Sequence, residues 1–429
     1  MGAHLQPTSQ RSLRFVLAAV VLGSAATAHA LERPVAVAAA PPAVSTGLPQ
    51  VADLNGDGVP DLVVVNAASN SLDLYFGTGT FLPLAPDATL TGTPTNRLRS
   101  PRDIALGDFN GDGVTDIAVT NFRGASVSIF LGNQNAITHL GDGTFAGPTN
   151  IPVPRGPLGL AAGRFRGVGQ PLDLAVVGHS NRKDGTVTVL LGNGDGTFTS
   201  AGDFAVGRKP KHIAVGDFGT MHGNGIRDGV LDVAVTVRGE QRVAVLFGDG
   251  TGNLSAPDLY SGSLGPDAII TGDFNDDGCS DLITTNHWAK DNVINMYLGI
   301  CAVSPFGTFG GATEMARFSA HAKTAGVTAV DLNGDAYPDL AVTNPRDNQV
   351  FLLVNNGRLG PNLIIISYTK VACATAGRAP LGITAAHFNP NTDARDDLAV
   401  ANSRSEDLLI FLGTGSTTLC PGPLEIGHP

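Results

Sequence analysis

The chain has 429 residues, of which 42% are hydrophobic, and a formal net charge of −11. The hydrophobic content argues against an intrinsically disordered chain, and the acidic balance gives no reason to expect a nucleic-acid partner. With 55 glycines, 27 prolines and only 6% aromatic residues, the composition favours short, tightly turned strands.

The first 30 residues have the pattern of an export signal. Arg11 and Arg14 precede an apolar run over 15–26, and Ala-His-Ala at 28–30 has the small-residue pattern of a cleavage site. A membrane anchor is the alternative, but the run is too short to cross a bilayer comfortably. We therefore expect cleavage near Ala30 and a mature protein, residues 31–429, that is extracellular or periplasmic and has no membrane span. Losing the two signal arginines changes the formal charge from −11 to −13.

A segment at 33–38 precedes the first repeat and has the residues of an extended strand. A closed ring of repeats needs its two ends tied together, so we predict that this segment pairs with the last repeat near 408–412. The C-terminal segment 424–426 is the alternative for the same place.

A nine-residue acidic pattern then begins at Asp53. Side-chain oxygens occupy positions 1, 3, 5 and 9, a backbone carbonyl can serve at position 7, and Gly56 and Gly58 allow a tight bend. Ca²⁺ takes about 6–8 oxygen ligands of this kind. Four copies of the pattern are complete, which gives the candidate metal ligands Asp53, Asn55, Asp57, Val59, Asp61, Asp108, Asn110, Asp112, Val114, Asp116, Asp273, Asn275, Asp277, Cys279, Asp281, Asp331, Asn333, Asp335, Tyr337 and Asp339.

The pattern recurs along the whole chain, with loop starts at 53, 108, 164, 217, 273, 331 and 387. Each copy contains four short β-branched or apolar runs bounded by Gly, Asn or Asp, and no long window has helical periodicity. Seven copies with four strands each predict an all-β fold, a seven-bladed β-propeller with four-stranded antiparallel blades.

Three copies depart from the complete pattern. The third has Arg164 and Arg166 where carboxylates are expected, and the seventh starts at His387 and is two residues longer, so neither should bind Ca²⁺ well. The fourth is stretched and is a tentative site, with Asp217, Asp228 and Asp232 as ligands. We expect about four structural Ca²⁺ ions, whose eight positive charges would change the mature charge from −13 to −5.

The motif Asp-x-Asn-Gly-Asp-Gly-x-x-Asp-Leu, followed by a β-run and by Leu-Gly-Asn-Gly-Asp-Gly-Thr-Phe at 191–198, resembles FG-GAP/VCBS repeats of the integrin α N-terminal propeller superfamily. The resemblance covers essentially the whole mature chain and implies Ca²⁺ in the loops joining first and second strands. Ala336 replaces the usual glycine, which weakens the sixth site. An EF-hand does not fit, because Val64 holds its twelfth position and a strand follows. Members of the family include adhesion modules, carbohydrate-associated proteins and enzyme-linked domains, so the resemblance does not settle function.

No catalytic pattern stands out. The ten histidines lack HxH or HExxH spacing, and no G-x-S-x-G sequence is present. Trp288 can stack on a sugar or pack between blades. The cysteines form no CxxC pair; Cys279–Cys301 and Cys373–Cys420 disulfides are candidates, with buried thiols as the alternative.

Basic residues gather in the predicted turns between second and third strands and in the links between blades, which share the face opposite the metal loops. These places hold 17 of the mature chain's 25 Lys and Arg residues. The candidate ligand-binding residues among them are Arg99, Arg155, Arg208, Arg378, Arg123, Arg346 and Arg404.

We therefore expect a recognition or adhesion module whose cationic face binds an anionic glycan, such as an acidic polysaccharide or lipopolysaccharide, or an acidic protein surface. Solvated turns partly neutralised by neighbouring acids are the alternative explanation of the charges. The alternative function is a polysaccharide-active enzyme with its site in the central funnel. The sequence identifies neither the ligand nor the oligomeric state.

Overall fold

The computed structural model describes residues 35–36, 49–79, 85–179, 185–219, 228–262, 264–286, 293–300, 309, 313–317, 323–331, 337–358, 366–388, 396–405 and 407–411, with side chains described except at 35–36, 313–317 and 356–375. The proposed export signal and the C-terminal segment 424–426 lie outside these residues.

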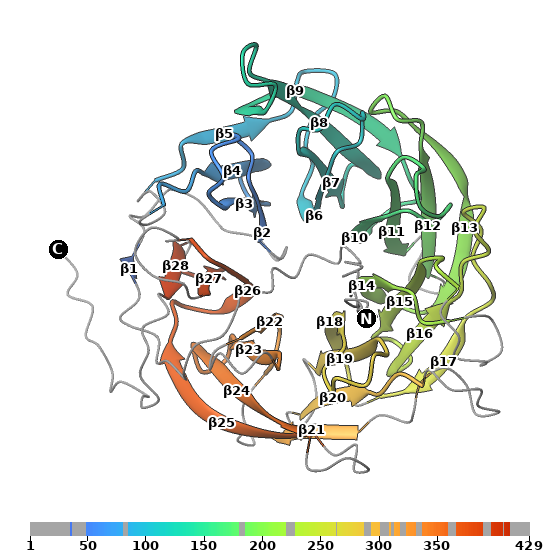
Figure 1. Ribbon diagram of the computed structural model, residues 1–429, viewed down its shortest axis with the longest axis vertical. Coiled ribbons are helices and arrows are strands. Elements are labelled where there is room, and N and C mark those ends of the chain that lie inside the picture. Colours follow the sequence, from blue (N-terminus) through green and yellow to red (C-terminus); the bar gives the residue numbers. More distant parts are fainter. Residues whose placement is uncertain are drawn as a thin grey trace, which may run out of the picture.

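The described strands form seven four-stranded antiparallel sheets around a central axis (Figure 1). This confirms the predicted all-β, seven-bladed propeller. Blades 1 to 3 consist of β2 (Gln50–Ala52), β3 (Asp61–Asn66), β4 (Ser71–Tyr75), β5 (Ala88–Thr91); β6 (Pro101–Gly107), β7 (Asp116–Asn121), β8 (Ser126–Gln134), β9 (Gly141–Pro152); and β10 (Pro157–Gly163), β11 (Asp173–His179), β12 (Gly185–Gly192), β13 (Phe198–Gly207).

Blades 4 to 7 continue in the same order. They consist of β14 (Pro210–Gly216), β15 (Asp232–Val237), β16 (Arg242–Leu246), β17 (Asp258–Ser261); β18 (Pro266–Gly272), β19 (Asp281–Asn286), β20 (Val293–Tyr297), β21 (Thr313–Arg317); β22 (Val327–Val330), β23 (Asp339–Asn344), β24 (Gln349–Arg358), β25 (Ile366–Thr375); and β26 (Pro380–Ala386), β27 (Asp397–Asn402), β28 (Asp407–Phe411) with β1 (Val35–Ala36).

The N-terminal strand closes the ring. In β1, Val35 pairs with Ile410 and Ala36 with Leu409 of β28, so a strand from the start of the chain completes the last blade. This confirms the predicted pairing of segment 33–38. Blades 1 and 7 consequently lie side by side in Figure 1.

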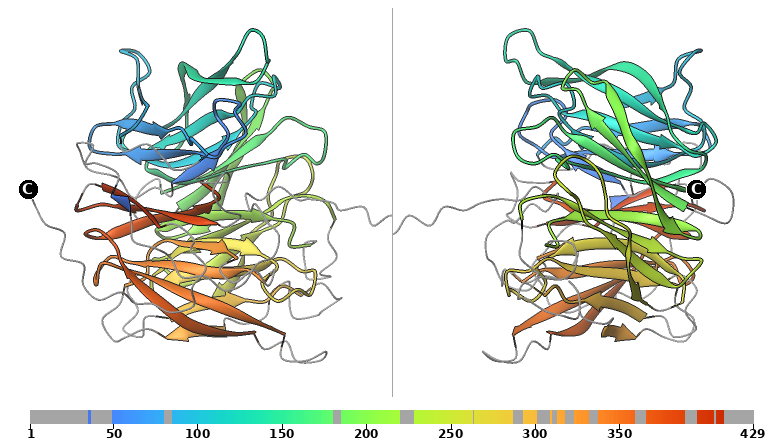
Figure 2. Two further views of the ribbon diagram at one scale, coloured as in Figure 1. Left: turned by 60° about the vertical axis from the view of Figure 1, so that its left-hand side comes forward. Right: turned by 90° about the vertical axis from the view of Figure 1, so that its right-hand side faces the viewer.

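Each blade has its first strand beside the axis and its fourth at the rim (Figure 1). The acidic loops and the turns between third and fourth strands lie at one end of the blades, which we call the loop face. The turns between second and third strands and the links between blades lie at the other end, which we call the link face. The β8–β9 hairpin, in teal, projects at the loop face (Figure 2), and Ile137 at its tip is 88% exposed.

The core is divided into seven apolar clusters, each between two neighbouring blades. The second residue of the acidic loop enters the cluster shared with the next blade; Phe109, Phe165 and Phe388 are fully buried there. Loops 3 and 7 keep this aromatic residue although they lack the acidic pattern, because packing between blades is a separate requirement.

Threonine hydroxyls add polar links between blades. Thr120 of β7 donates to the carbonyl of Leu158 in blade 3 at 2.9 Å, and Thr285 of β19 donates to Ala325, at the start of blade 6, at 2.6 Å. Both hydroxyls also accept a backbone N–H from their own blade. Among the residues that the structure describes, no helix is long and apolar enough to cross a membrane.

Candidate functional site

The first acidic loop is held by its own side chains. Asp53 accepts the backbone N–H of Gly56 at 2.7 Å and of Gly58 at 2.9 Å, and both glycines have a positive φ, of 75° and 82°. Asn55 Oδ1 accepts the N–H of Asp57 at 3.0 Å. Asp108 makes the corresponding bonds in loop 2, so the bend predicted from the sequence forms in the same way in both copies.

Each loop ends in an aspartate that is completely buried in all seven blades. It is the ninth residue of the complete pattern, and we call it the ninth aspartate in every blade. In blade 1, Asp61 Oδ2 accepts the N–H of Leu54 at 2.7 Å and Oδ1 accepts the N–H of Gly77 at 2.8 Å. This carboxylate therefore ties the acidic loop to the end of the third strand. Asp397 keeps the bond to Phe388 N–H, at 3.0 Å, in the seventh blade, whose loop departs from the metal pattern. The ninth aspartate thus has a structural role that does not depend on a metal, which sequence reasoning missed.

In blades 1 to 5 a glycine donates the second of these bonds. In blade 2 the N–H of Gly132 reaches Asp116 Oδ1 at 2.8 Å, and a Cβ on Gly132 would lie 2.6 Å from the carbonyl oxygen of Thr115. A Cβ added at four further glycines would likewise lie 2.1–2.4 Å from a backbone carbonyl oxygen: Gly77, Gly192, Gly248 and Gly299. The repeated apolar-Gly sequence at the end of the third strand is explained by this close approach.

The acidic side chains of a loop are close enough to oppose one another's ionisation. Burial raises the pKa of Asp61 to about 7, and the charges of Asp57 and Asp53 add to the rise. Burial likewise raises the pKa of Asp281 to about 7, with Asp277 and Asp273 adding to it. A cation bound at these loops would offset this repulsion.

The donor set of the complete loops fits Ca²⁺ in its chemistry, because it offers three carboxylates, an amide oxygen and a backbone carbonyl. In the described part of the chain, no three Asp, Glu, His or Cys side chains are already grouped as a site that could hold a metal ion. The carboxylates of Asp53, Asp57 and Asp61 accept loop or strand amides instead.

Blade 3 contains its own cation. Arg166, the third residue of the loop, lies 2.5 Å from Asp173 Oδ1, and its guanidinium also donates to the carbonyl of Gly192 at 2.6 Å. The Asp173 side chain is fully buried and that of Arg166 is 23% exposed. A guanidinium thus meets the ninth carboxylate in the copy where the acidic pattern is lost. The presence of arginine at a ligand position was the sequence signal for this pairing.

Loop 4, which is stretched, and loop 6, which has the complete pattern, are described only in part. In loop 4, Asp217 accepts the N–H of Gly229 at 2.9 Å, and burial raises the pKa of Asp232 to about 8, with Asp217 and Asp228 adding to the rise. In loop 6, Asn333 and Asp335 lie outside the described residues, while Asp339 accepts the N–H of Asn355 at 2.7 Å. Trp288 and Cys301 also lie outside them. The side chain of Cys279 is in a disulfide. The proposed ligand at this position is the backbone carbonyl, which takes no part in that bond.

Two loops are latched to the following blade. Gly143, near the start of β9 in blade 2, donates to the carbonyl of Leu54 in loop 1 at 3.2 Å. Gly196 of blade 3 donates to Phe109 of loop 2 at 3.1 Å. These hydrogen bonds therefore link the conformation of loops 1 and 2 to the packing of each loop's blade against the next blade.

The link face carries the predicted cationic residues. Each of the following arginines is exposed: Arg99, Arg123, Arg155, Arg208, Arg346, Arg378 and Arg404. Of the ion pairs between described residues, only one involves this set, with Arg208 Nε 3.9 Å from Glu240. Two acidic residues close in sequence to Arg346 and Arg404 bond to asparagine side chains: Asp347 accepts Asn344 Nδ2 at 2.7 Å, and Asp407 accepts Asn402 Nδ2 at 2.8 Å.

A buried ion cluster joins blades 4 and 5 near the same face. Asp267, with a side chain 2% exposed, bonds to Arg238 at 2.7 Å and to Lys211, and it lies 3.7 Å from His212 Nε2. The two cations hold the pKa of Asp267 near 2 despite its burial, and burial with the charge of Lys211 lowers the pKa of His212 to about 3. His212 is therefore neutral at pH 7.

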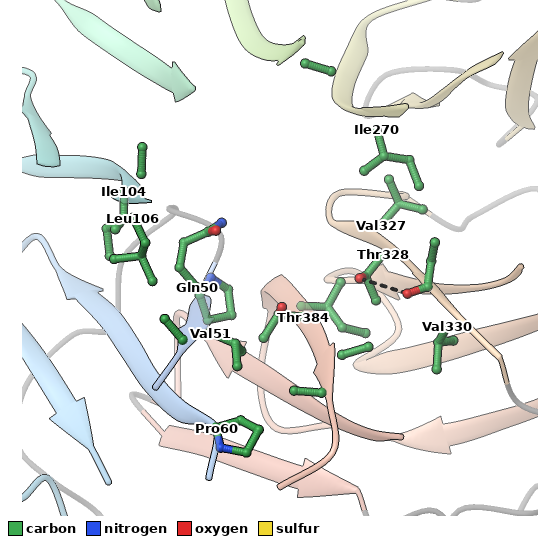
Figure 3. A pocket seen from close by; sticks show the side chains of 18 of the residues that line it. Gln50, Val51, Pro60, Ile104, Leu106, Ile270, Val327, Thr328, Val330 and Thr384 are labelled. Carbon is green, nitrogen blue, oxygen red and sulfur yellow. Dashed lines mark hydrogen bonds between the residues drawn. The ribbon is translucent and has the colours of Figure 1, made fainter. Parts of the chain in front are cut away.

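An axial cavity of about 500 Å³ lies between the first strands of the blades. Figure 3 shows side chains such as Ile104, Leu106 and Val327 around it. The wall is mostly apolar, and the ionisable lining residues, Asp53, Asp331, His387 and Asp396, belong to the loop face. Burial raises the pKa of Asp396 to about 6.

Parts of the chain match FG-GAP repeat families. The FG-GAP-like repeat family matches residues 53–119, and the FG-GAP repeat family matches 100–139 and 324–359, which include loops 1, 2 and 6. No curated protein matches the chain.

Solved structures share the fold at low sequence identity. BBS1N, in its complex with ARL6DN, is 14% identical with a TM-score of 0.55, and the match covers 92% of this chain and 99% of that one. A catalytically inactive virginiamycin B lyase from Staphylococcus aureus, solved with quinupristin, is 13% identical with a TM-score of 0.52 over 86% and 94%. A functionally unknown protein from Desulfotomaculum acetoxidans is 12% identical with a TM-score of 0.52 over 82% and 94%.

Proposed function

We propose that this FG-GAP propeller is an exported recognition or adhesion module that binds an anionic partner through its link face. The exposed arginines of that face carry the proposal. They come from several blades, and Asp347 and Asp407, which lie close in sequence to Arg346 and Arg404, accept hydrogen bonds from asparagine side chains. Such a surface attracts an acidic glycan or an acidic protein surface.

The complex of BBS1N with ARL6DN supplies an example of a propeller of this shape bound to a protein partner. That likeness concerns the fold alone, so the partner class here rests on the charge of the link face.

Calcium has a structural role in this proposal. Asp53, Asn55, Asp57, Asp61 and the carbonyl of Val59 would hold one ion in loop 1, and the corresponding residues of loops 2, 5 and 6 would hold the others. Bound Ca²⁺ would neutralise the clustered carboxylates. Because loops 1 and 2 contact the next blade through Leu54 and Phe109, ordering them would stabilise the ring.

The function is tested by binding at increasing salt with charge reversal. The variant carries Arg99→Glu, Arg155→Glu, Arg208→Glu and Arg378→Glu. We expect binding of acidic glycans that weakens with salt in the natural protein and is lost in the variant. Unchanged binding after reversal would contradict the role of this face.

A polysaccharide-active enzyme is the second candidate, and the axial cavity with Asp396 at its loop-face end is the feature that favours it. The same glycans should therefore be assayed for turnover. Cleavage that is lost in Asp396→Asn would support the enzyme, whereas binding without turnover supports the module.

A further inference from the structure

Two arginine pairs on the link face have the same backbone geometry. In blade 2 the N–H of Arg123 donates to the carbonyl of Arg99 at 3.1 Å, and in blade 7 the N–H of Arg404 donates to the carbonyl of Arg378 at 3.0 Å. The first arginine of each pair comes from the link before the blade and the second from the turn between second and third strands. All four side chains are exposed, and none takes part in an ion pair between described residues.

Backbone hydrogen bonds fix the main-chain positions of each pair before any ligand arrives. The residue after the first arginine, Ser100 or Ala379, has a positive φ, of 54° or 57°, and is followed by proline. Its carbonyl accepts a second N–H from the turn, at 3.1 Å from Phe122 in blade 2 and at 3.0 Å from Ser403 in blade 7. Two consecutive bonds therefore hold the link against the turn, and less ordering is left to occur on binding.

Blade 4 has the same backbone arrangement without the second arginine. The N–H of Gly239 donates to the carbonyl of Arg208 at 3.0 Å, and Glu240 follows. The Glu240 carboxylate accepts the N–H of Arg208 at 2.8 Å and lies near its guanidinium. Blade 4 therefore has the same backbone arrangement, but Gly239 stands in place of the second arginine and Glu240 lies beside the first, Arg208.

We propose that the arginine pairs of blades 2 and 7 are two equivalent anion subsites that together bind one linear polyanionic polysaccharide. They lie on either side of blade 1 (Figure 1). This inference rests on the proposed function and names the ligand class and the residues. Guanidinium groups match sulfate and carboxylate groups through paired N–H donors. Two identical subsites fit a polymer that repeats one anionic group, and a polymer that occupies both gains affinity from the linkage.

The test measures binding of the full chain to dextran sulfate of graded length, at fixed calcium and salt. Uncharged dextran is the matched neutral polymer, and poly-L-glutamate represents an acidic polypeptide. The variants are Arg99→Ser with Arg123→Ser, Arg378→Ser with Arg404→Ser, and all four together, with Arg164→Ser, an exposed arginine of loop 3 on the loop face, as control. These substitutions keep the backbone N–H and carbonyl groups, and melting curves verify that the fold is retained.

We expect long dextran sulfate to bind at least about tenfold more weakly to either pair variant, since removing one subsite ends bivalent binding. The fourfold variant should lose most of the remaining affinity. Arg164→Ser should change it less than about twofold, and chains too short to reach both subsites should bind weakly to the natural protein.

The outcomes separate this inference from the proposed function. If neither dextran sulfate nor poly-L-glutamate binds the natural protein, both fail. If dextran sulfate binds without dependence on length, or neither pair variant weakens its binding more than Arg164→Ser does, the two-subsite inference fails and the anion-binding function stands. If poly-L-glutamate binds and dextran sulfate does not, the partner is an acidic protein and the polysaccharide is ruled out.

Discussion

The guanidinium of Arg166 lies 2.5 Å from the fully buried carboxylate of Asp173 in blade 3. In the other blades the corresponding aspartate also accepts backbone N–H groups, and in the complete copies it belongs to a candidate Ca²⁺ loop. Blade 3 therefore has the cationic side chain of Arg166 where the blades with complete loops are expected to bind Ca²⁺. The stability of blade 3 should not depend on calcium.

Arg166→Leu removes the charged partner of a buried carboxylate and should destabilise the protein by about 3 kcal/mol. The loss should be the same in calcium and in EDTA, as measured by the midpoint of urea unfolding. Arg164→Leu, in the same loop but exposed, is the control and should change stability by less than about 0.5 kcal/mol. If calcium restored the unfolding midpoint of Arg166→Leu, loop 3 would bind the metal, contrary to this prediction.

Substituting a loop aspartate that is proposed to bind metal should have a different effect from substituting one whose role is structural. Asp57→Asn removes a proposed ligand, so it should lower the number of bound Ca²⁺ ions by one and lower the melting temperature only when calcium is present. Asp397→Asn disturbs a buried carboxylate in the blade without a metal pattern. It should destabilise by about 1–3 kcal/mol with or without calcium and leave the ion count unchanged. An unchanged melting temperature of the natural protein after its calcium is removed would refute the structural role of the metal.

Gly132→Ala should destabilise the protein because the new Cβ would meet the carbonyl oxygen of Thr115 at 2.6 Å. We expect a cost of about 2–3 kcal/mol, since the obstacle is backbone that cannot rotate away. Gly113→Ala is the control: its φ is 84° but nothing lies within 4 Å of the added atom, so only about 1 kcal/mol of backbone strain applies. Both are measured by urea unfolding in EDTA, and equal losses would show that the close approach is unimportant.

Acid should destabilise the protein through His212. Its pKa is about 3 in the folded protein against an ordinary value of 6.5, so between these pH values the unfolded chain binds a proton that the folded chain does not. Stability therefore falls as the pH is lowered through this window, by up to about 1.4 kcal/mol per pH unit from this group. His212→Gln should lose less stability than the natural protein between pH 7 and pH 5, as followed by urea midpoints. Parallel losses in the two proteins would contradict a neutral, buried His212.

The sequence alone was enough to predict the repeat, the number of blades, the four strands of each blade and the closure of the ring by segment 33–38. Spacing and β-branched runs determine these features, because each copy must bury its strands against the next. The loop residues could also be located, since the bend follows from glycines and short-range bonds such as that between Asp53 and Gly56.

Only the tertiary structure decided how residues from different segments meet. The ninth aspartates act as ties because a third strand brings a glycine N–H such as that of Gly77 to Asp61, 16 positions away in the sequence. Asp267 meets Lys211 across a blade boundary, 56 positions away. The pairing of Arg99 with Arg123 depends on how a link packs against a turn. Such contacts follow from the positions of strands around the axis, which local residue preferences do not specify.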